Sequence, residues 1–194
     1  MATSSSQADP APVEIAVLGS ARIGPGDPRH DDAQRLGGLL AAQGWTVVTG
    51  GYGGLMAAVA KGASAAGGQT VGLPMREWRH LTPDAGCAEL RWSASYAERI
   101  GYLLATSVAI ALPGGVGTLA EASGVWAAAQ TEPGAAQLVL VGPAWRALMD
   151  AFARELVIGE QDLALPVVVE DVGAAIPAVR RLLDTPATAL GARG

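Results

Sequence analysis

Three glycine-rich turns are the segments of this chain best suited to bind an anion. They are Gly19-Ser20-Ala21-Arg22, Gly50-Gly51-Tyr52-Gly53-Gly54 and Pro113-Gly114-Gly115-Val116-Gly117-Thr118. In the third turn, glycines let the main chain approach a ligand closely. The helix expected after it directs free N–H groups and the positive end of its dipole to the same point. This turn can therefore hold a phosphate without a lysine side chain.

A purely structural interpretation of the third turn also fits. Thr118 followed three residues later by Glu121 matches a capping box, in which Thr118 is the N-cap and Glu121 bonds back to it. A tight turn from strand to helix would need nothing more. At the level of the sequence, both interpretations stay open.

Glu121 and Arg99 could supply chemistry beside the turn. Ser95-Tyr96-Ala97-Glu98 is another capping-box pattern, which places Arg99 in the opening turns of a helix. Arg99 can then face the same crevice as Glu121. A carboxylate and a fixed cation around a phosphate suit hydrolysis of a glycosidic bond in a nucleotide, because the carboxylate stabilises an oxocarbenium-like sugar or orients water. The alternative for Arg99 is an ordinary surface ion pair.

Two other nucleotide-binding motifs fit less well. A triphosphate-binding loop needs Gly-Lys-Ser/Thr, whereas Lys61 is followed by Gly62 outside any such frame. The run from Gly115 to Ala120 matches the Gly-x-Gly-x-x-Ala form of the dinucleotide fingerprint. However, the next predicted strand, 137–141, ends in Gly142-Pro143 without the acidic residue that binds a ribose. NAD is therefore disfavoured.

Strands and helices that alternate along the chain must position these residues. Short apolar runs predict strands at 13–18, 45–49, 69–73, 87–91, 107–112, 137–141 and 167–169. Helical periodicity predicts helices at 31–43, 55–66, 95–106, 118–130 and 144–156, with a last helix ending at 184, and 74–86 is read as a loop. This pattern is typical of an α/β fold, a Rossmann-like doubly wound parallel sheet with helices on both faces. Ligands bind at the carboxyl edge of such a sheet, where the glycine turns lie.

Composition narrows the class of protein. The 194 residues, 50% of them hydrophobic, predict one domain at 13–186 between a disordered N-terminal tail, 1–12, and a C-terminal tail, 187–194. A net charge of −5, with Lys61 as the only lysine, argues against nucleic acid and anionic membranes as partners.

Cys87 is the only cysteine and there are two histidines, so neither a disulfide framework nor a metal site is expected. No cofactor is expected either. No signal peptide or long apolar run is found, so we expect a cytoplasmic protein.

The small-residue helices at 55–66 and 118–130 permit close helix approach. They could form a subunit interface, or pack within one chain on its own sheet. The sequence does not separate these two alternatives.

The motifs together resemble those of the Lonely Guy (LOG) family. Pro113-Gly114-Gly115-Val116-Gly117-Thr118-Leu119-Ala120-Glu121 is similar to its Pro-Gly-Gly-x-Gly-Thr-x-x-Glu motif, and Gly50-Gly51-Tyr52-Gly53-Gly54-Leu55-Met56 to its glycine-rich Gly-Leu-Met segment. Gly19-Ser20 resembles its opening Gly-Ser, and Glu98-Arg99 its acidic-arginine pair. The resemblance extends over most of the chain.

This resemblance implies a Rossmann-like phosphoribohydrolase, a homodimer or higher homo-oligomer, that cleaves a nucleoside 5′-monophosphate to free base and ribose 5-phosphate. The substrate would be of the AMP or cytokinin riboside monophosphate type. Arg99 and Glu121 would be catalytic. The residues expected to bind the phosphate and the rest of the substrate are Gly19, Ser20, Gly50, Gly51, Gly114, Gly115, Val116, Gly117 and Thr118.

Two departures from the LOG pattern bear on the substrate. Cytokinin-activating members usually have Arg-Lys where this chain has Arg99-Ile100, and Ala57 replaces the glycine after Leu-Met. These differences bring the chain nearer to molybdenum-cofactor carrier proteins, relatives that hold a phosphorylated pterin without catalysis. A carrier or binding protein for a phosphorylated cofactor is therefore the alternative to the hydrolase.

Overall fold

A computed structural model describes residues 12–185, so nearly all of both expected tails lies outside the described residues. The chain forms one seven-stranded sheet, ordered β4-β3-β2-β1-β5-β6-β7, in which every pair of neighbours is parallel. The strands are β1 (Glu14–Leu18), β2 (Thr46–Thr49), β3 (Thr70–Gly72), β4 (Glu89–Leu90), β5 (Val108–Ala111), β6 (Gln137–Val141) and β7 (Val167–Val169). The predicted doubly wound α/β fold is confirmed.

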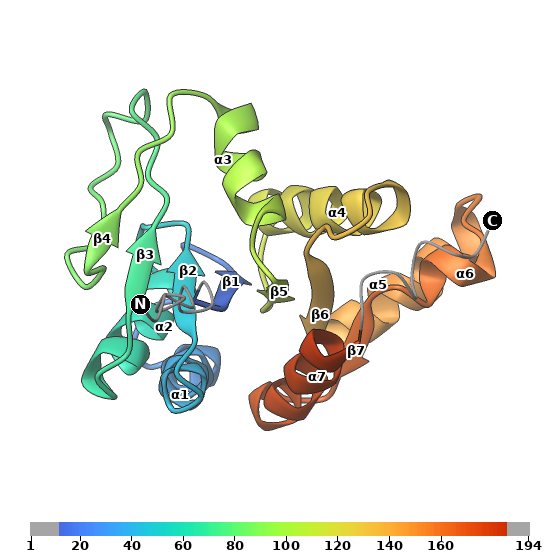
Figure 1. Cartoon of the computed structure of the whole chain (residues 1–194), viewed down its shortest axis with the longest axis horizontal. Helices are drawn as coiled ribbons and strands as arrows, with labels where there is room; N and C mark the ends of the chain where they lie inside the picture. The colour runs from blue at the N-terminus through green and yellow to red at the C-terminus, as the bar shows by residue number, and fades with distance from the viewer. Residues whose placement is uncertain (1–11, 186–194) are drawn as a thin grey trace, which may run out of the picture.

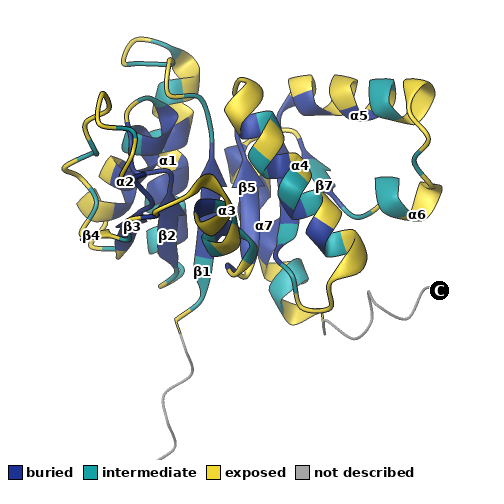
Figure 2. Ribbon diagram, turned by 90° about the horizontal axis from the view of Figure 1, so that it is seen from above, coloured by how far each residue is buried: buried dark blue, intermediate teal, exposed yellow. Residues whose placement is uncertain are grey.

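Helices cover both faces of the sheet (Figure 1). They are α1 (Pro28–Ala41), α2 (Leu55–Ala65), α3 (Tyr96–Leu104), α4 (Val116–Thr131), α5 (Pro143–Glu155), α6 (Glu160–Leu163) and α7 (Val172–Asp184). Alternate side chains of each strand enter two separate cores. Ile15 and Val17 of β1 pack with α1, α2 and α7, whereas Ala16 and Leu18 pack with α3, α4 and α5. Figure 2 accordingly shows buried strands between helices with exposed outer faces.

Close packing of α1 against α2 explains the small residues of the second helix. A Cβ atom on Gly37 would lie 2.0 Å from the Val59 carbonyl oxygen, and one on Gly62 would lie 1.8 Å from the Gln34 carbonyl oxygen. Only glycine fits at either position, so the two backbones are almost in contact. The small side chains of α2 thus serve packing within one chain.

Two helix starts differ from the sequence prediction. Helix α1 begins three residues early, because Pro28 occupies its first turn and the Asp27 carboxylate caps it by accepting from the Arg29 N–H at 2.9 Å. Helix α4 begins at Val116 with Gly115 as its N-cap. The capping-box interpretation of Thr118 is therefore wrong, since Thr118 already lies inside the helix.

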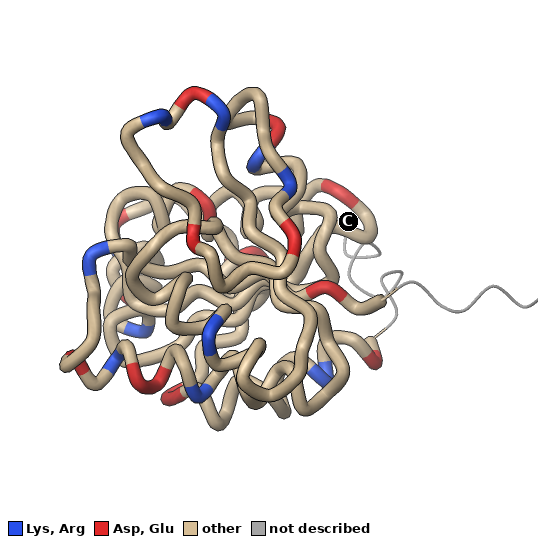
Figure 3. Tube along the Cα trace, turned by 90° about the vertical axis from the view of Figure 1, so that its left-hand side faces the viewer, with Lys and Arg blue, Asp and Glu red and all other residues tan. Residues whose placement is uncertain are grey.

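The surface carries charges of both signs, which are interspersed along the chain trace in Figure 3. Among residues 12–185, no helix combines the length and apolar character needed to cross a membrane.

Candidate functional site

The three predicted glycine turns meet at one place on the carboxyl edge of the sheet. Strand β1 lies between β2 and β5, and chain connections run in opposite directions on its two sides, which is where ligands bind in folds of this kind. Ser20 joins the turns through its backbone. Its N–H donates to the Pro113 carbonyl at 3.3 Å, and its carbonyl accepts from the Leu55 N–H at 2.9 Å. The three turns predicted to bind an anion are therefore neighbours in the structure.

Helix α3 delivers Arg99 to this convergence. Ser95 is the N-cap and its hydroxyl accepts from the Glu98 N–H at 3.2 Å, while the Glu98 carboxylate accepts from the Ala94 N–H at 2.6 Å. The predicted cap is present, with the return bond one residue earlier than in a standard capping box. This cap fixes the start of α3 so that the Arg99 side chain points into the protein, where the residue is only 3% exposed.

The Arg99 guanidinium ties three separate elements together. Nη1 donates to the Gly50 carbonyl oxygen at 2.9 Å and also to the Leu73 carbonyl oxygen. Nη2 donates to Glu121 Oε1 at 3.1 Å. Nε is buried and has no partner among the described residues. A surface ion pair, the alternative for Arg99, is therefore wrong. Of the five N–H donors of the guanidinium, Nε–H and the second hydrogen of Nη2 have no acceptor among the described residues.

Two aromatic rings flank the same guanidinium. Its Cζ lies 5.9 Å from the centre of the Tyr52 ring and 5.6 Å from that of Trp78. The rings are 5.8 Å apart, and the Tyr52 hydroxyl accepts from the Met75 N–H at 2.8 Å. The irregular segment 74–86 thus folds back over Arg99. Tyr52 was missed in the sequence analysis, although a large aromatic side chain inside a glycine cluster is a usable signal.

Glu121 lies in the second turn of α4, and its side chain is only 12% exposed. Burial raises the pKa of this carboxyl group, and the Arg99 guanidinium opposes that rise. The pKa of Tyr96 is raised by its own burial and by the Glu121 charge, with Arg99 again opposing the effect. The predicted carboxylate and cation are thus brought together, and both side chains are largely buried.

The turn before α4 has backbone N–H groups that no side chain caps. At Gly114, a Cβ atom would lie 2.1 Å from Thr118 Oγ1, so the turn closes only with glycine there. Gly115 and Gly117 have open space where their Cβ atoms would be. The start of α4 therefore combines uncapped N–H groups with space for added atoms at Gly115 and Gly117, and uncapped helix N-termini of this kind favour anions.

Replacing Gly117 by Ala should separate stability from ligand binding. Alanine in the first turn of α4 is expected to raise the free energy of unfolding by about 0.5–1 kcal/mol. Because Cβ atoms tilt toward a helix N-terminus, the added methyl group should enter the space proposed for the phosphate and weaken nucleotide binding at least about tenfold. Chemical denaturation and isothermal titration would measure the two effects.

Gly101→Ala in α3, where the Cβ also meets open space, is the matched control. Unchanged affinity in Gly117→Ala would contradict the placement of the anion.

Gly50 and Gly51 bind parts of the protein itself. Gly51 has a φ of +76°, its N–H donates to Thr49 Oγ1 at 3.2 Å, and its carbonyl accepts from the Asp84 N–H at 2.8 Å. The Gly50 carbonyl holds Arg99, as described above. The contacts of both residues position the guanidinium and the segment above it.

Substitution of Gly50 by Ala should displace Arg99 without unfolding the protein. The new Cβ would lie 2.5 Å from Arg99 Nη2 and 2.4 Å from Met56 Sδ, and both atoms are ends of flexible side chains that can move. Since misplacement of a reacting group by about 1 Å can cost ~10²-fold in rate, we expect a loss of this order in the activity proposed below. Gly53→Ala, with open space at Cβ, should retain full activity. Equal activity of the two variants in a steady-state assay would show that the position of Arg99 is unimportant.

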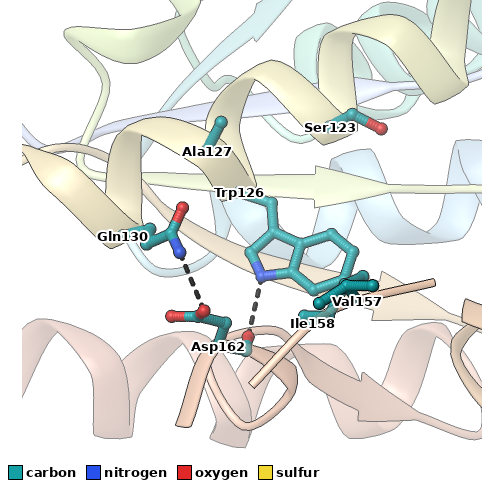
Figure 4. A pocket seen from close by; sticks show the side chains of 7 residues that line it. All are labelled: Ser123, Trp126, Ala127, Gln130, Val157, Ile158 and Asp162. Carbon is teal, nitrogen blue, oxygen red and sulfur yellow. Dashed lines mark hydrogen bonds between the residues drawn. The ribbon is translucent and has the colours of Figure 1, made fainter. Parts of the chain in front are cut away.

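A separate hollow of about 230 Å³ lies further along α4, against α6 (Figure 4). The indole Nε1 of Trp126 donates to the Asp162 carbonyl oxygen at 2.8 Å, and Gln130 Nε2 donates to Asp162 Oδ2 at 2.8 Å. None of the predicted site residues lines it. The polar groups of Trp126 and Gln130 are already paired with Asp162, so this hollow is a weaker candidate than the surroundings of Arg99 and Glu121.

The fold, the glycine turns and the buried Arg99–Glu121 pair define a Rossmann-like α/β protein of the LOG type. The chain belongs to the SLOG cluster4 family, which matches residues 12–132. This confirms the family resemblance read from the motifs.

Two kinds of named protein are among those similar to this chain. Two mycobacterial proteins are named cytokinin riboside 5′-monophosphate phosphoribohydrolase. That of Mycobacterium tuberculosis is 42% identical over 48% of this chain and 52% of its own length, and that of Mycobacterium marinum is 39% identical over 51% and 57%. This chain therefore matches only about half the length of these two relatives. A molybdenum cofactor carrier protein from Chlamydomonas reinhardtii superposes with a TM-score of 0.73 and 27% identity, over 90% of this chain and 99% of the carrier.

Proposed function

We propose that this protein is a phosphoribohydrolase that cleaves the N-glycosidic bond of a nucleoside 5′-monophosphate, of the AMP or cytokinin riboside monophosphate type. The observation that carries the proposal is the buried pair of Arg99 and Glu121, joined at 3.1 Å beside an uncapped glycine turn. The mycobacterial relatives named for this activity support it. Arg99 and Glu121 would be the catalytic residues.

In the proposed reaction, the 5′-phosphate binds the N–H groups at the start of α4. Glu121 lies three residues beyond Thr118, about 4.5 Å further along the helix axis, so its carboxylate can reach the sugar of a nucleotide held by that phosphate. Positive charge develops on the sugar as the C1′–N bond breaks, and the carboxylate stabilises it. The oxygen of a water molecule then bonds to C1′. One proton of that water leaves with the base, and the products are the free base and ribose 5-phosphate.

Arg99 would keep Glu121 in place during this step. Its Nη1 is held by two backbone carbonyls, so the guanidinium cannot rotate away, and Nη2 fixes the carboxylate. Nε–H, which has no partner among the described residues, can donate to a hydroxyl or anionic group of the substrate. Both residues are thus oriented before the substrate arrives.

Assays of base release test the proposal directly. The purified chain would be incubated with AMP, GMP, CMP, UMP and N6-isopentenyl AMP, and free base would be separated by chromatography. Release from at least one of them is expected, and it would identify the preferred base. No release from any of them, together with tight binding of a phosphorylated ligand, would leave the carrier function.

The activity should depend on pH through Glu121. Its ionised form is the active one, so kcat/KM should fall as pH falls through the carboxyl pKa. Because burial raises that pKa, the fall should be centred above the ordinary range of a glutamate side chain. A profile of kcat/KM against pH would measure the position of this limb. A limb within the ordinary carboxyl range would show that another group is titrating.

The second candidate is a carrier of a phosphorylated cofactor. It is favoured by one specific observation, the similarity to the Chlamydomonas carrier over 99% of that protein. The same uncapped turn would hold the phosphate, and Glu121 would serve only to neutralise Arg99. Under this alternative, Glu121→Gln leaves ligand affinity intact and there is no turnover to lose.

A further inference from the structure

A hollow of about 340 Å³ lies beside the phosphate turn, on the opposite side of the sheet edge from β2 and β3. Leu112 and Pro113, the two residues that precede Gly114, form one of its walls, and it extends across the ends of β6 and β7. This volume falls within the range of small-molecule sites. We refer to it as the β5–β7 hollow.

The floor of the β5–β7 hollow is apolar and well fixed. Val141, Pro143, Ala144 and Val172 line it together with the wall from β5. The indole Nε1 of the buried Trp145 donates at 3.3 Å to the carbonyl oxygen of Leu112, one of the lining residues. Such a floor accommodates a ring or another apolar body.

Charged groups form the rim. Three carboxylates, Asp32, Glu170 and Asp171, stand against one guanidinium, that of Arg29. Arg29 is itself bonded to Asp27 at 2.6 Å, so it is not free to attract an anion. The carboxylates have partners too: Glu170 pairs with Arg146 at 2.7 Å, and Asp32 pairs with Arg35 at 3.6 Å. Asp171 Oδ1 caps α7 by accepting from the Gly173 and Ala174 N–H groups. Carboxylate oxygens outside these contacts can still accept from hydroxyl groups, and they repel a second terminal phosphate.

The distance from the phosphate turn is short. Neighbouring strands lie about 4.8 Å apart, so the end of β7 is only about 10 Å from the end of β5, where the phosphate turn begins. A sugar joined through a phosphodiester or pyrophosphate link can span this distance without leaving the turn. In dinucleotide-binding folds an acidic residue at the end of a strand binds a ribose. Strand β6 has no such residue after it, but Glu170 and Asp171 follow the next strand, β7.

We propose that the β5–β7 hollow binds the second half of a dinucleotide, a ribosyl group with its ring, whose phosphate is held by the turn before α4. The inference rests on the proposed function only for the placement of that phosphate. The carboxylates of the rim accept from the hydroxyls of the second ribose, as an acidic residue at a strand end does in dinucleotide-binding folds. The ring then lies on the apolar floor.

Titration of the full chain with AMP, ADP and NAD⁺ tests the inference. NAD⁺ should bind at least about tenfold more tightly than AMP. ADP should gain nothing over AMP, because its added phosphate faces the carboxylates. Ala144→Trp, at an exposed position in the first turn of α5, should fill the hollow and abolish the gain of NAD⁺ while leaving the Kd of AMP within about twofold. Ala147→Trp, exposed on the same helix but outside the hollow, should retain the gain.

The outcomes separate this inference from the hydrolase proposal. NAD⁺ that binds no more tightly than AMP, or a gain that survives Ala144→Trp, overturns the inference, whether or not AMP is hydrolysed. If NAD⁺ binds more tightly than AMP and this gain disappears only in Ala144→Trp, the inference is supported. This holds even if no base is released from AMP, a result that would overturn the hydrolase proposal alone. Failure of all three nucleotides to bind overturns both.

Discussion

The Glu121→Gln variant is expected to lose about 10²- to 10⁴-fold in kcat for base release while its affinity for nucleotide changes only a few-fold. Glutamine keeps the length and most of the shape of the side chain and can still accept from Arg99 Nη2. What it removes is the negative charge that would stabilise the developing positive charge of the sugar. The loss should therefore appear in kcat and in kcat/KM to a similar degree.

Glu132→Gln is the matched control for this variant. Glu132 is exposed at the C-terminal end of the same helix, far along α4 from the glycine turn. Steady-state kinetics and isothermal titration on both variants would separate turnover from binding. Full activity of Glu121→Gln would remove this residue from the chemistry, and a loss of affinity as large as the loss of rate would mean that Glu121 mainly binds the substrate.

Most of the sheet could be predicted from the sequence because most of its strands are short apolar runs followed closely by glycine or proline. Strands β6 and β7 occur at the residues expected, 137–141 and 167–169. Helix starts were harder to predict. At α4, the Thr118–Glu121 pattern suggested a cap, but Gly115 takes that position and leaves the N–H groups uncapped. The helix start was predicted too late at the very position where the backbone is proposed to bind a ligand.

The pairing of Arg99 with Glu121 was also predictable, because helices that follow parallel strands begin at the same edge of the sheet. The other partners of Arg99 were not. Its acceptors on Gly50 and Leu73 are backbone carbonyls, which every residue possesses, so no residue type marks them. Tyr52 and Trp78 lie in two irregular segments. Such segments have no periodic pattern that would indicate which of their side chains point toward Arg99. The segment 74–86 could be flagged as a loop, but its position over the guanidinium comes only from the tertiary structure.

Arg99→Ala should damage both activity and stability, in contrast to Glu121→Gln. The change removes the donor that links Gly50, Leu73 and Glu121, and it leaves the Glu121 carboxylate buried without a counter-charge. Breaking a buried pair in this way typically costs about 3–5 kcal/mol of unfolding free energy. We also expect base release to fall at least about 10³-fold, because neither the carboxylate nor the segment above it is then held in place. Arg154→Ala, which removes an exposed arginine paired with Glu155, should change neither property appreciably.

A double-mutant cycle would show whether the loss of stability comes from the uncompensated carboxylate. If it does, adding Glu121→Gln to Arg99→Ala should recover part of the lost free energy of unfolding, because the second change neutralises a buried charge that has no partner. Urea denaturation of the four proteins measures the coupling. Strictly additive effects would mean that Arg99 stabilises the fold through the Gly50 and Leu73 carbonyls alone. Glu121 would then be held by α4 itself. The role of Arg99 in the proposed reaction would be reduced to the donors that no group within residues 12–185 accepts from, Nε–H and the second hydrogen of Nη2.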